Sequence, residues 1–244
     1  MRYLPLNDTD RGDMLARIGV QSVDELFADI PEDVRMKGLL DLPKRASEME
    51  VERKLSAMAS KNTAAGSVPF FVGAGAYKHH VPATVDHLIQ RSEFLTSYTP
   101  YQPEISQGTL QFLFEFQTQV ALITGMDVAN ASMYDGASAA AEAVMMAVRI
   151  NNGTRVLLPR SLHPFYRRVV ETYVRGIGLE IVEIPWRDDG SLDLERVEAE
   201  LADGTAAVVV QNPNFLGVLE PMEEIGALVN PSPAAYVAAV NPIC

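Results

Sequence analysis

The second half of the sequence predicts an α/β protein built around a parallel sheet. Short apolar segments at residues 155–158, 179–184, 206–210 and 235–240 alternate with segments of helical periodicity. Repeated strand and helix units of this size imply a parallel sheet with helices on both faces. The first half lacks this alternation and has the pattern of helices separated by short breaks.

The overall composition fits a soluble globular protein and excludes several classes of function. The 244 residues, 48% of them apolar, suffice for one large domain with a substantial core. A net charge of -12 argues against binding to a nucleic-acid backbone or to anionic lipid. No charged-then-apolar leader is expected after Met1, because polar and charged residues interrupt the start, and no apolar run is long enough to span a membrane. Because Cys244 is the only cysteine, no internal disulfide can form and a cytoplasmic location is expected.

Residues 1–62 are expected to form a helical arm in front of an incomplete α/β domain at residues 63–244. Three helices with polar N-caps are predicted in the arm: residues 10–18 after Thr9, residues 23–30 after Ser22, and residues 48–59 after Ser47. The third has an apolar face opposite a charged one. Such an arm either clamps a neighbour or forms a small cluster on its own chain.

A glycine-rich turn is expected near residue 75. Gly73 and Gly75 match only the beginning of a dinucleotide fingerprint, since the third glycine is absent. The glycines are expected to let the backbone bend close to another surface, with Tyr77 and the pair His79 and His80 exposed. No histidine spacing aims two imidazoles at one ion, so no metal site is predicted.

The segment from Ser97 to Gly108 is the strongest candidate for a functional loop. Pro100 and Pro103 lack a backbone donor and hold the preceding residues extended, which disfavours both helix and central strand. Between them and around them lie four side chains able to bind or orient a polar ligand: Tyr98, Tyr101, Gln102 and Glu104. The alternative is a rigid connector whose tyrosine rings only pack.

Two helices are predicted after this loop. The first, ending at Gly125, is apolar around most of its circumference and is therefore expected in the heart of a domain. The second is opened by the small residues Gly136, Ala137 and Ser138, which leave its first N–H groups unobstructed. This helix start is a potential anion seat, and close helix packing through alanine is the alternative.

Residues 159–164 and 211–214 are expected at the carboxyl ends of the strands, where α/β sheets bind their ligands. The sequence ends directly behind the strand at 235–240, with nothing left to complete the sheet. We therefore expect a truncated piece of a larger protein.

The loop also carries a family resemblance. The run Ser-Tyr-Thr-Pro-Tyr-Gln-Pro-Glu-Ile-Ser-Gln-Gly at 97–108, with Thr-Gly-Met-Asp-Val-Ala-Asn-Ala-Ser at 124–132, closely resembles the P-proteins of the glycine cleavage system. Within that family it resembles subunit 1, the N-terminal half of P-proteins that are split into two chains. The resemblance implies the large domain of a pyridoxal-phosphate-dependent transferase, aspartate aminotransferase-like and of fold type I, truncated and preceded by a helical arm.

The resemblance also implies a reaction. Glycine dehydrogenase (decarboxylating), an oxidoreductase, uses pyridoxal phosphate as the electron sink for decarboxylation of glycine and passes the aminomethyl group to the lipoyl arm of the H-protein. In split enzymes, the lysine that holds the cofactor belongs to subunit 2. In agreement, Lys78 is the last lysine here, and Asn241 stands where a cofactor-bearing homologue would offer an acid. The expected partners are subunit 2, lipoylated H-protein and glycine, and this chain alone is expected to be inactive.

The resemblance gives the loop residues non-covalent roles. Tyr98 and Tyr101 would donate hydrogen bonds to the carboxylate of glycine or to the cofactor, while Gln102 and Glu104 would orient them or the substrate amine. 

Two further residues resemble cofactor-binding positions. Ser138 and His163 occupy positions like the phosphate seat and the ring-stacking residue of the cofactor-bearing half, and are expected to be remnants here. Two alternatives stay open: a purely structural partner subunit, and an independent fold type I enzyme whose lysine lies beyond residue 244.

Overall fold

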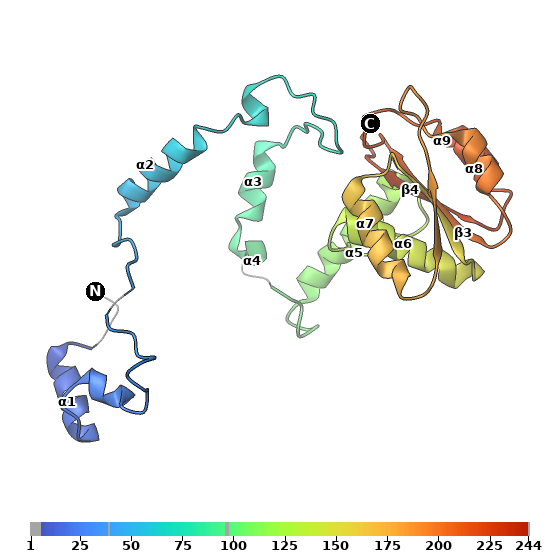
Figure 1. Ribbon diagram of the computed structural model, residues 1–244. Helices are drawn as coiled ribbons and strands as arrows, with labels where there is room; N and C mark the ends of the chain where they lie inside the picture. Colours follow the sequence, from blue (N-terminus) through green and yellow to red (C-terminus); the bar gives the residue numbers. More distant parts are fainter. Residues whose placement is uncertain (1–5, 39, 96–97, 244) are drawn as a thin grey trace. The chain divides into compact units, whose positions relative to one another are not determined.

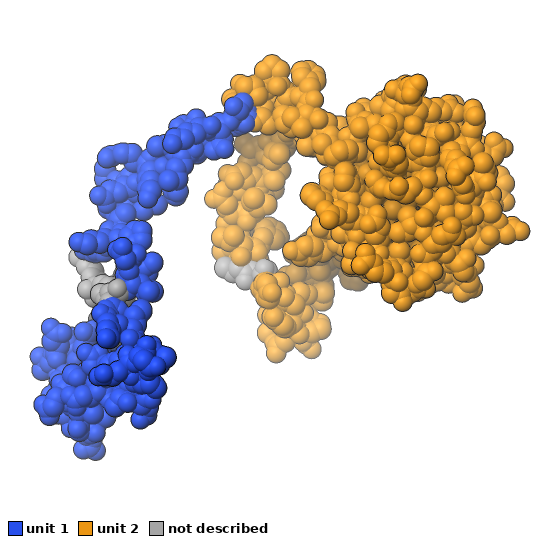
Figure 2. Space-filling model, viewed as in Figure 1, with its two compact units in different colours: residues 1–64 blue, residues 65–244 orange. Residues whose placement is uncertain are grey.

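The computed structural model describes residues 6–38, 40–95 and 98–243, so Ser97 and Cys244 lie outside the described residues. The chain divides into two compact units, Met1–Ala64 and Ala65–Cys244 (Figure 2). The assignment of residues 1–62 as an arm and 63–244 as an incomplete domain stays a prediction.

The first unit contains three helical segments: α1 (Asp8–Ile18), the 3-10 helix η1 (Val23–Phe27) and α2 (Glu48–Ala59). The predicted cap Thr9 is wrong, because Asn7 and Asp10 exchange side-chain and backbone hydrogen bonds and begin the helix two residues earlier. The predicted caps Ser22 and Ser47 are confirmed. Glu50 accepts hydrogen bonds from the N–H and the Oγ of Ser47 at 2.7 and 2.8 Å.

The second unit begins with helical segments before the sheet: η2 (Ala65–Ser67), α3 (Ala83–Ile89), α4 (Ser92–Leu95) and α5 (Gln107–Thr124). The predicted burial of α5 is wrong, since none of its residues is buried and Phe114 and Leu122 are 69% and 77% exposed. Among the described residues, no element packs along this helix closely enough to cover its apolar circumference. Gly125 ends α5 in the left-handed conformation, as predicted.

Four parallel strands form the predicted sheet, in the order β2-β1-β3-β4. They are β1 (Arg155–Pro159), β2 (Glu180–Ile184), β3 (Thr205–Asn212) and β4 (Ala235–Val240). Each is reached through a helix, as the alternating sequence pattern predicts.

Four helices cover the sheet: α6 (Gly136–Asn151) and α7 (Pro164–Arg175) on one face, and α8 (Leu194–Glu200) and α9 (Met222–Val229) on the other (Figure 1). Successive side chains of β1 alternate between the two cores: Val156 and Leu158 pack with α6 and α7, and Leu157 packs with α8 and α9. All three are fully buried. A strand buried on both faces must be continuously apolar, which explains its sequence.

Within the part of the chain that the structure describes, no helix is both long and apolar enough to cross a membrane.

Candidate functional site

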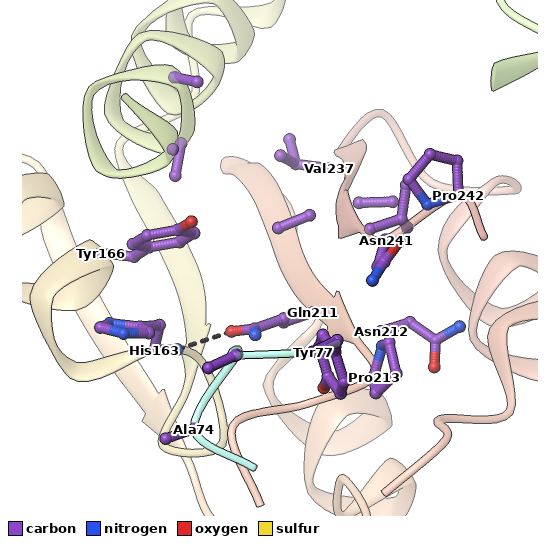
Figure 3. Close-up of a pocket in the computed structure, with 18 of the residues that line it drawn as sticks. Ala74, Tyr77, His163, Tyr166, Gln211, Asn212, Pro213, Val237, Asn241 and Pro242 are labelled. Carbon is purple, nitrogen blue, oxygen red and sulfur yellow. Dashed lines mark hydrogen bonds between the residues drawn. The ribbon is translucent and has the colours of Figure 1, made fainter. Parts of the chain in front are cut away.

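A cavity of about 580 Å³ lies at the carboxyl ends of β3 and β4, beside the first turns of α6 and α7 (Figure 3). Its lining includes Gln211 and Asn212 from the end of β3 and Asn241 directly after β4. The predicted rim segments 159–164 and 211–214 both contribute to it. Ligand sites of parallel sheets form here because strand ends and helix starts meet at this edge.

The glycine-rich turn closes one side of the cavity. Gly73, Ala74 and Gly75 have φ angles of 67°, 56° and 75°, and the N–H of Ala74 donates to the carbonyl of Phe215 at 3.2 Å. A Cβ at Gly75 would lie 3.5 Å from His163 Cδ2, so the predicted close approach of the backbone is confirmed.

The side chains after this turn differ partly from the prediction. Tyr77 is half-buried in the cavity wall rather than exposed, because the turn lies against the end of β3 instead of projecting from it. His79 and His80 are exposed as predicted, and His79 Nε2 lies 3.5 Å from Asn241 Nδ2. Among the described residues, no group of three or more His, Cys, Asp or Glu side chains could hold a metal ion.

His163 joins α7 to the cavity. Its Nδ1 accepts the N–H of Phe165 at 3.1 Å, and its backbone N–H donates to Gln211 Oε1 at 2.8 Å. Since Nδ1 accepts, the neutral imidazole carries its proton on Nε2. Figure 3 shows the ring of Tyr166 lying over the imidazole, with centroids 5.0 Å apart and an interplanar angle of 29°.

The start of α6 is not the unobstructed anion seat that the sequence predicted. The Asp135 carboxylate caps the helix by accepting the N–H of Ser138 at 2.7 Å and the Ser138 hydroxyl. The hydroxyl and then the backbone hydrogen bond lower the pKa of Asp135, so a negative charge stands at neutral pH where an anion would bind. The side chain of Tyr166 covers Gly136, the residue after Asp135. A Cβ on Gly136 would lie 2.6 Å from Tyr166 Cζ and closer still to the hydroxyl oxygen.

A buried polar cluster holds the loop after β3. Asn214 is fully buried. Its side-chain NH2 group donates to the Gly190 carbonyl at 2.8 Å and to Glu220 Oε1 at 2.7 Å. Its side-chain oxygen accepts the backbone N–H groups of Leu216 and Val218 at 2.9 and 3.1 Å. Glu220 Oε2 accepts the N–H of Leu192 at 2.9 Å, and the Glu220 N–H donates to Asn212 Oδ1 at 3.0 Å. Sequence reasoning missed both residues, although the Asn-Pro-Asn run marked the loop.

The four predicted catalytic residues lie elsewhere. Tyr98 and Tyr101 are 90% and 77% exposed, Gln102 and Glu104 are also exposed, and none of the four lines the cavity. Their segment is neither helix nor strand, as the prolines predicted, and turns into α5 through a hydrogen bond from the Ser106 N–H to the Gln102 carbonyl at 2.8 Å. The structure therefore does not bring this loop together with Ser138 and His163.

A parallel sheet with a cavity at its strand ends, bounded by a helix start, agrees with the large domain of fold type I pyridoxal-phosphate-dependent enzymes, the fold that the structural neighbours of this chain share. A sphingosine-1-phosphate lyase from Burkholderia pseudomallei shares this fold, with a TM-score of 0.53, 15% identity, and coverage of 85% of this chain and 50% of that chain. The family model of the glycine cleavage system P-protein matches residues 1–244, and the chain belongs to this family.

Two relatives give the extent of the similarity. A probable glycine dehydrogenase (decarboxylating) subunit 1 of Maricaulis maris is 58% identical over 238 residues, which cover 98% of this chain and 53% of that protein. The crystal structure of a glycine decarboxylase (P-protein) of the glycine cleavage system, in inhibitor-bound form, has a TM-score of 0.77 and 40% identity, covering 100% of this chain and 54% of that chain. This chain thus spans about half the length of the relatives that it matches.

The cavity of this chain does not fit pyridoxal phosphate. Among the described residues that line it, none is Lys, Arg, Asp or Glu, so it offers neither a covalent amine nor a charged partner for phosphate or pyridine nitrogen. The start of α6, which the resemblance assigns to the phosphate, holds the Asp135 carboxylate and lies beside the Tyr166 hydroxyl.

Proposed function

We propose that this chain belongs to subunit 1 of a two-chain glycine decarboxylase, and that it supplies non-covalent site residues to a partner that holds pyridoxal phosphate. In this enzyme glycine loses carbon dioxide, and its aminomethyl group passes to the lipoyl group of the H-protein. The cytoplasmic location expected from the cysteine usage belongs to the same proposal.

The observation that carries the proposal is that, among the described residues lining the cavity, none is a Lys, Arg, Asp or Glu that could hold the cofactor covalently or pair with its charges. Lys78 is the last lysine of the sequence, ahead of every strand, and Asn241 follows β4 where an acid would be needed. In the split form of this family a second polypeptide would hold the cofactor, and the lining of this cavity agrees with that division.

The exposed segment from Tyr98 through α5 supports a partner on that side of the unit. Exposing its apolar side chains to water as one surface would be unfavourable. A partner that covered this surface would bury their large aromatic groups. The same covering would place the phenols of Tyr98 and Tyr101 in a water-poor cleft. There a hydrogen bond to a carboxylate is stronger than in bulk water.

In that cleft, this chain's residues bind and orient the substrate. Tyr98 and Tyr101 donate phenolic hydrogen bonds to the carboxylate of glycine, while Gln102 and Glu104 orient the phenols or the substrate amine. The cofactor supplies the electron sink.

We expect that Tyr98→Phe or Tyr101→Phe, or both, lowers the rate of glycine–bicarbonate exchange by roughly 10- to 100-fold without changing the thermal midpoint, because each removes one hydroxyl that aims at developing charge. The substitutions are made in the subunit 1 polypeptide that contains this sequence. It is assayed with subunit 2, pyridoxal phosphate and lipoylated H-protein.

Tyr173→Phe, a half-exposed tyrosine on α7 that lies outside both the loop and the cavity lining, is the matched control and should keep full activity. If both loop variants also keep full activity, the loop assignment fails and a purely structural subunit is supported. A cofactor absorption band from the isolated chain would instead support an independent enzyme.

A further inference from the structure

Tyr166 packs at the edge of the core beneath α6 and α7, and its side chain also lines the cavity. It comes from the first turn of α7, its ring lies over the His163 imidazole, and its hydroxyl reaches the first residue of α6. By the family resemblance, His163 and the start of α6 correspond to the ring-stacking residue and the phosphate site of the cofactor-bearing half. A single side chain of this protein therefore spans both.

The residues around Tyr166 fit its presence. Position 136 is glycine, and any Cβ there would overlap the phenol ring. Asp135 places a carboxylate at the same helix start, where it satisfies the N–H of Ser138 and would repel a phosphate. At the start of α6, the Tyr166 ring thus fills the space and the Asp135 carboxylate supplies a negative charge where a phosphate would bind.

We propose that Tyr166 is an internal substitute for the cofactor: its ring occupies the stacking position on His163, its hydroxyl occupies the phosphate seat at Gly136, and together with Asp135 it closes this cavity to phosphorylated aromatic ligands. The proposal concerns the chain's own cavity and does not depend on the role of the Tyr98 loop. It predicts that the start of α6 becomes able to bind a phosphate when Tyr166 is shortened and Asp135 is neutralised.

The first test measures binding of pyridoxine 5′-phosphate, whose alcohol cannot react with the chain's lysines as an aldehyde would. We expect no saturable binding by the unmodified 244-residue chain. The double variant Tyr166→Ala with Asp135→Asn should bind saturably, with a Kd at least about tenfold below the highest concentration at which the unmodified chain shows no saturation. The two substitutions free the ring position and remove the negative charge while keeping a helix cap.

Tyr173→Ala with Asp135→Asn is the matched control, because Tyr173 lies on the same helix but does not line the cavity. It should bind no better than the unmodified chain. Equal binding by the unmodified chain and the Tyr166 variant would overturn the proposal, as would a Tyr166 variant with unchanged helical content that gains no affinity.

A second test examines the contact itself without any ligand. Gly136→Ala should lower Tm by roughly 5 °C, because the added methyl overlaps the phenol, and should have almost no effect in a Tyr166→Ala background. Equal losses in both backgrounds would show that Tyr166 does not occupy the seat.

Discussion

Replacing Asn214 with alanine is expected to lower the free energy of unfolding by about 3 kcal/mol, because four hydrogen bonds of a fully buried amide are lost together. The Gly190 carbonyl and the buried Glu220 carboxylate each lose a donor, and no side chain can take its place without rebuilding the loop. Removing one partner of a buried charged group costs more than the bond itself contributes. Urea unfolding of the full chain, compared at the transition midpoint, measures this loss.

Asn230→Ala is the matched control for this prediction, since Asn230 is an exposed asparagine at the end of α9 on the same side of the sheet. It should change the free energy of unfolding by less than about 0.5 kcal/mol. An Asn214→Ala variant as stable as this control would contradict the assigned cluster.

Gly153→Ala is expected to destabilise the second unit by roughly 3 kcal/mol, which corresponds to a fall in Tm of roughly 6 to 12 °C. Gly153 is buried between α6 and β1, and a Cβ there would lie 2.5 Å from both the N and the Cα of Ala206. A backbone neighbour cannot rotate away as a side chain can, so β3 or the turn would have to move. Differential scanning calorimetry of the full chain measures the shift.

The turn also has little freedom to move. Asn151 accepts the Gly153 N–H at 2.9 Å and donates to the Ala206 carbonyl at 2.8 Å, which holds the end of α6 against β3. Gly176→Ala is the control, because nothing lies within 4 Å of a Cβ at this helix end and its backbone is right-handed. It should be neutral or slightly stabilising. Equal Tm values for the two variants would contradict the close contact at Gly153.

Much of the fold could be predicted because it depends on periodicity. The apolar run at β3 and the amphipathic pattern of α7 determine which side chains are buried, and those patterns are local properties of the chain. Boundaries were less certain where two caps compete: Asn7 begins α1 in place of Thr9 because it finds a reciprocal partner three residues later. Burial of α5 could not be predicted, since an apolar helix is buried only where other elements surround it.

For the candidate site, the sequence by itself determined where the lysines lie. Lys78 is the last lysine among the 244 residues, so none follows β1, β2, β3 or β4 within them. The sequence also determined the family, through the loop at residues 97–108.

Only the tertiary structure decided which side chains line the cavity. Tyr166 is thirty residues from Gly136 in sequence, and no local pattern states that its hydroxyl reaches the start of α6. The same holds for Asn214 and Glu220, whose hydrogen bonds join segments that meet only when the sheet forms. Periodicity encodes which face of an element is buried, whereas contacts between elements depend on how the folded layers align, and that alignment exists only in three dimensions.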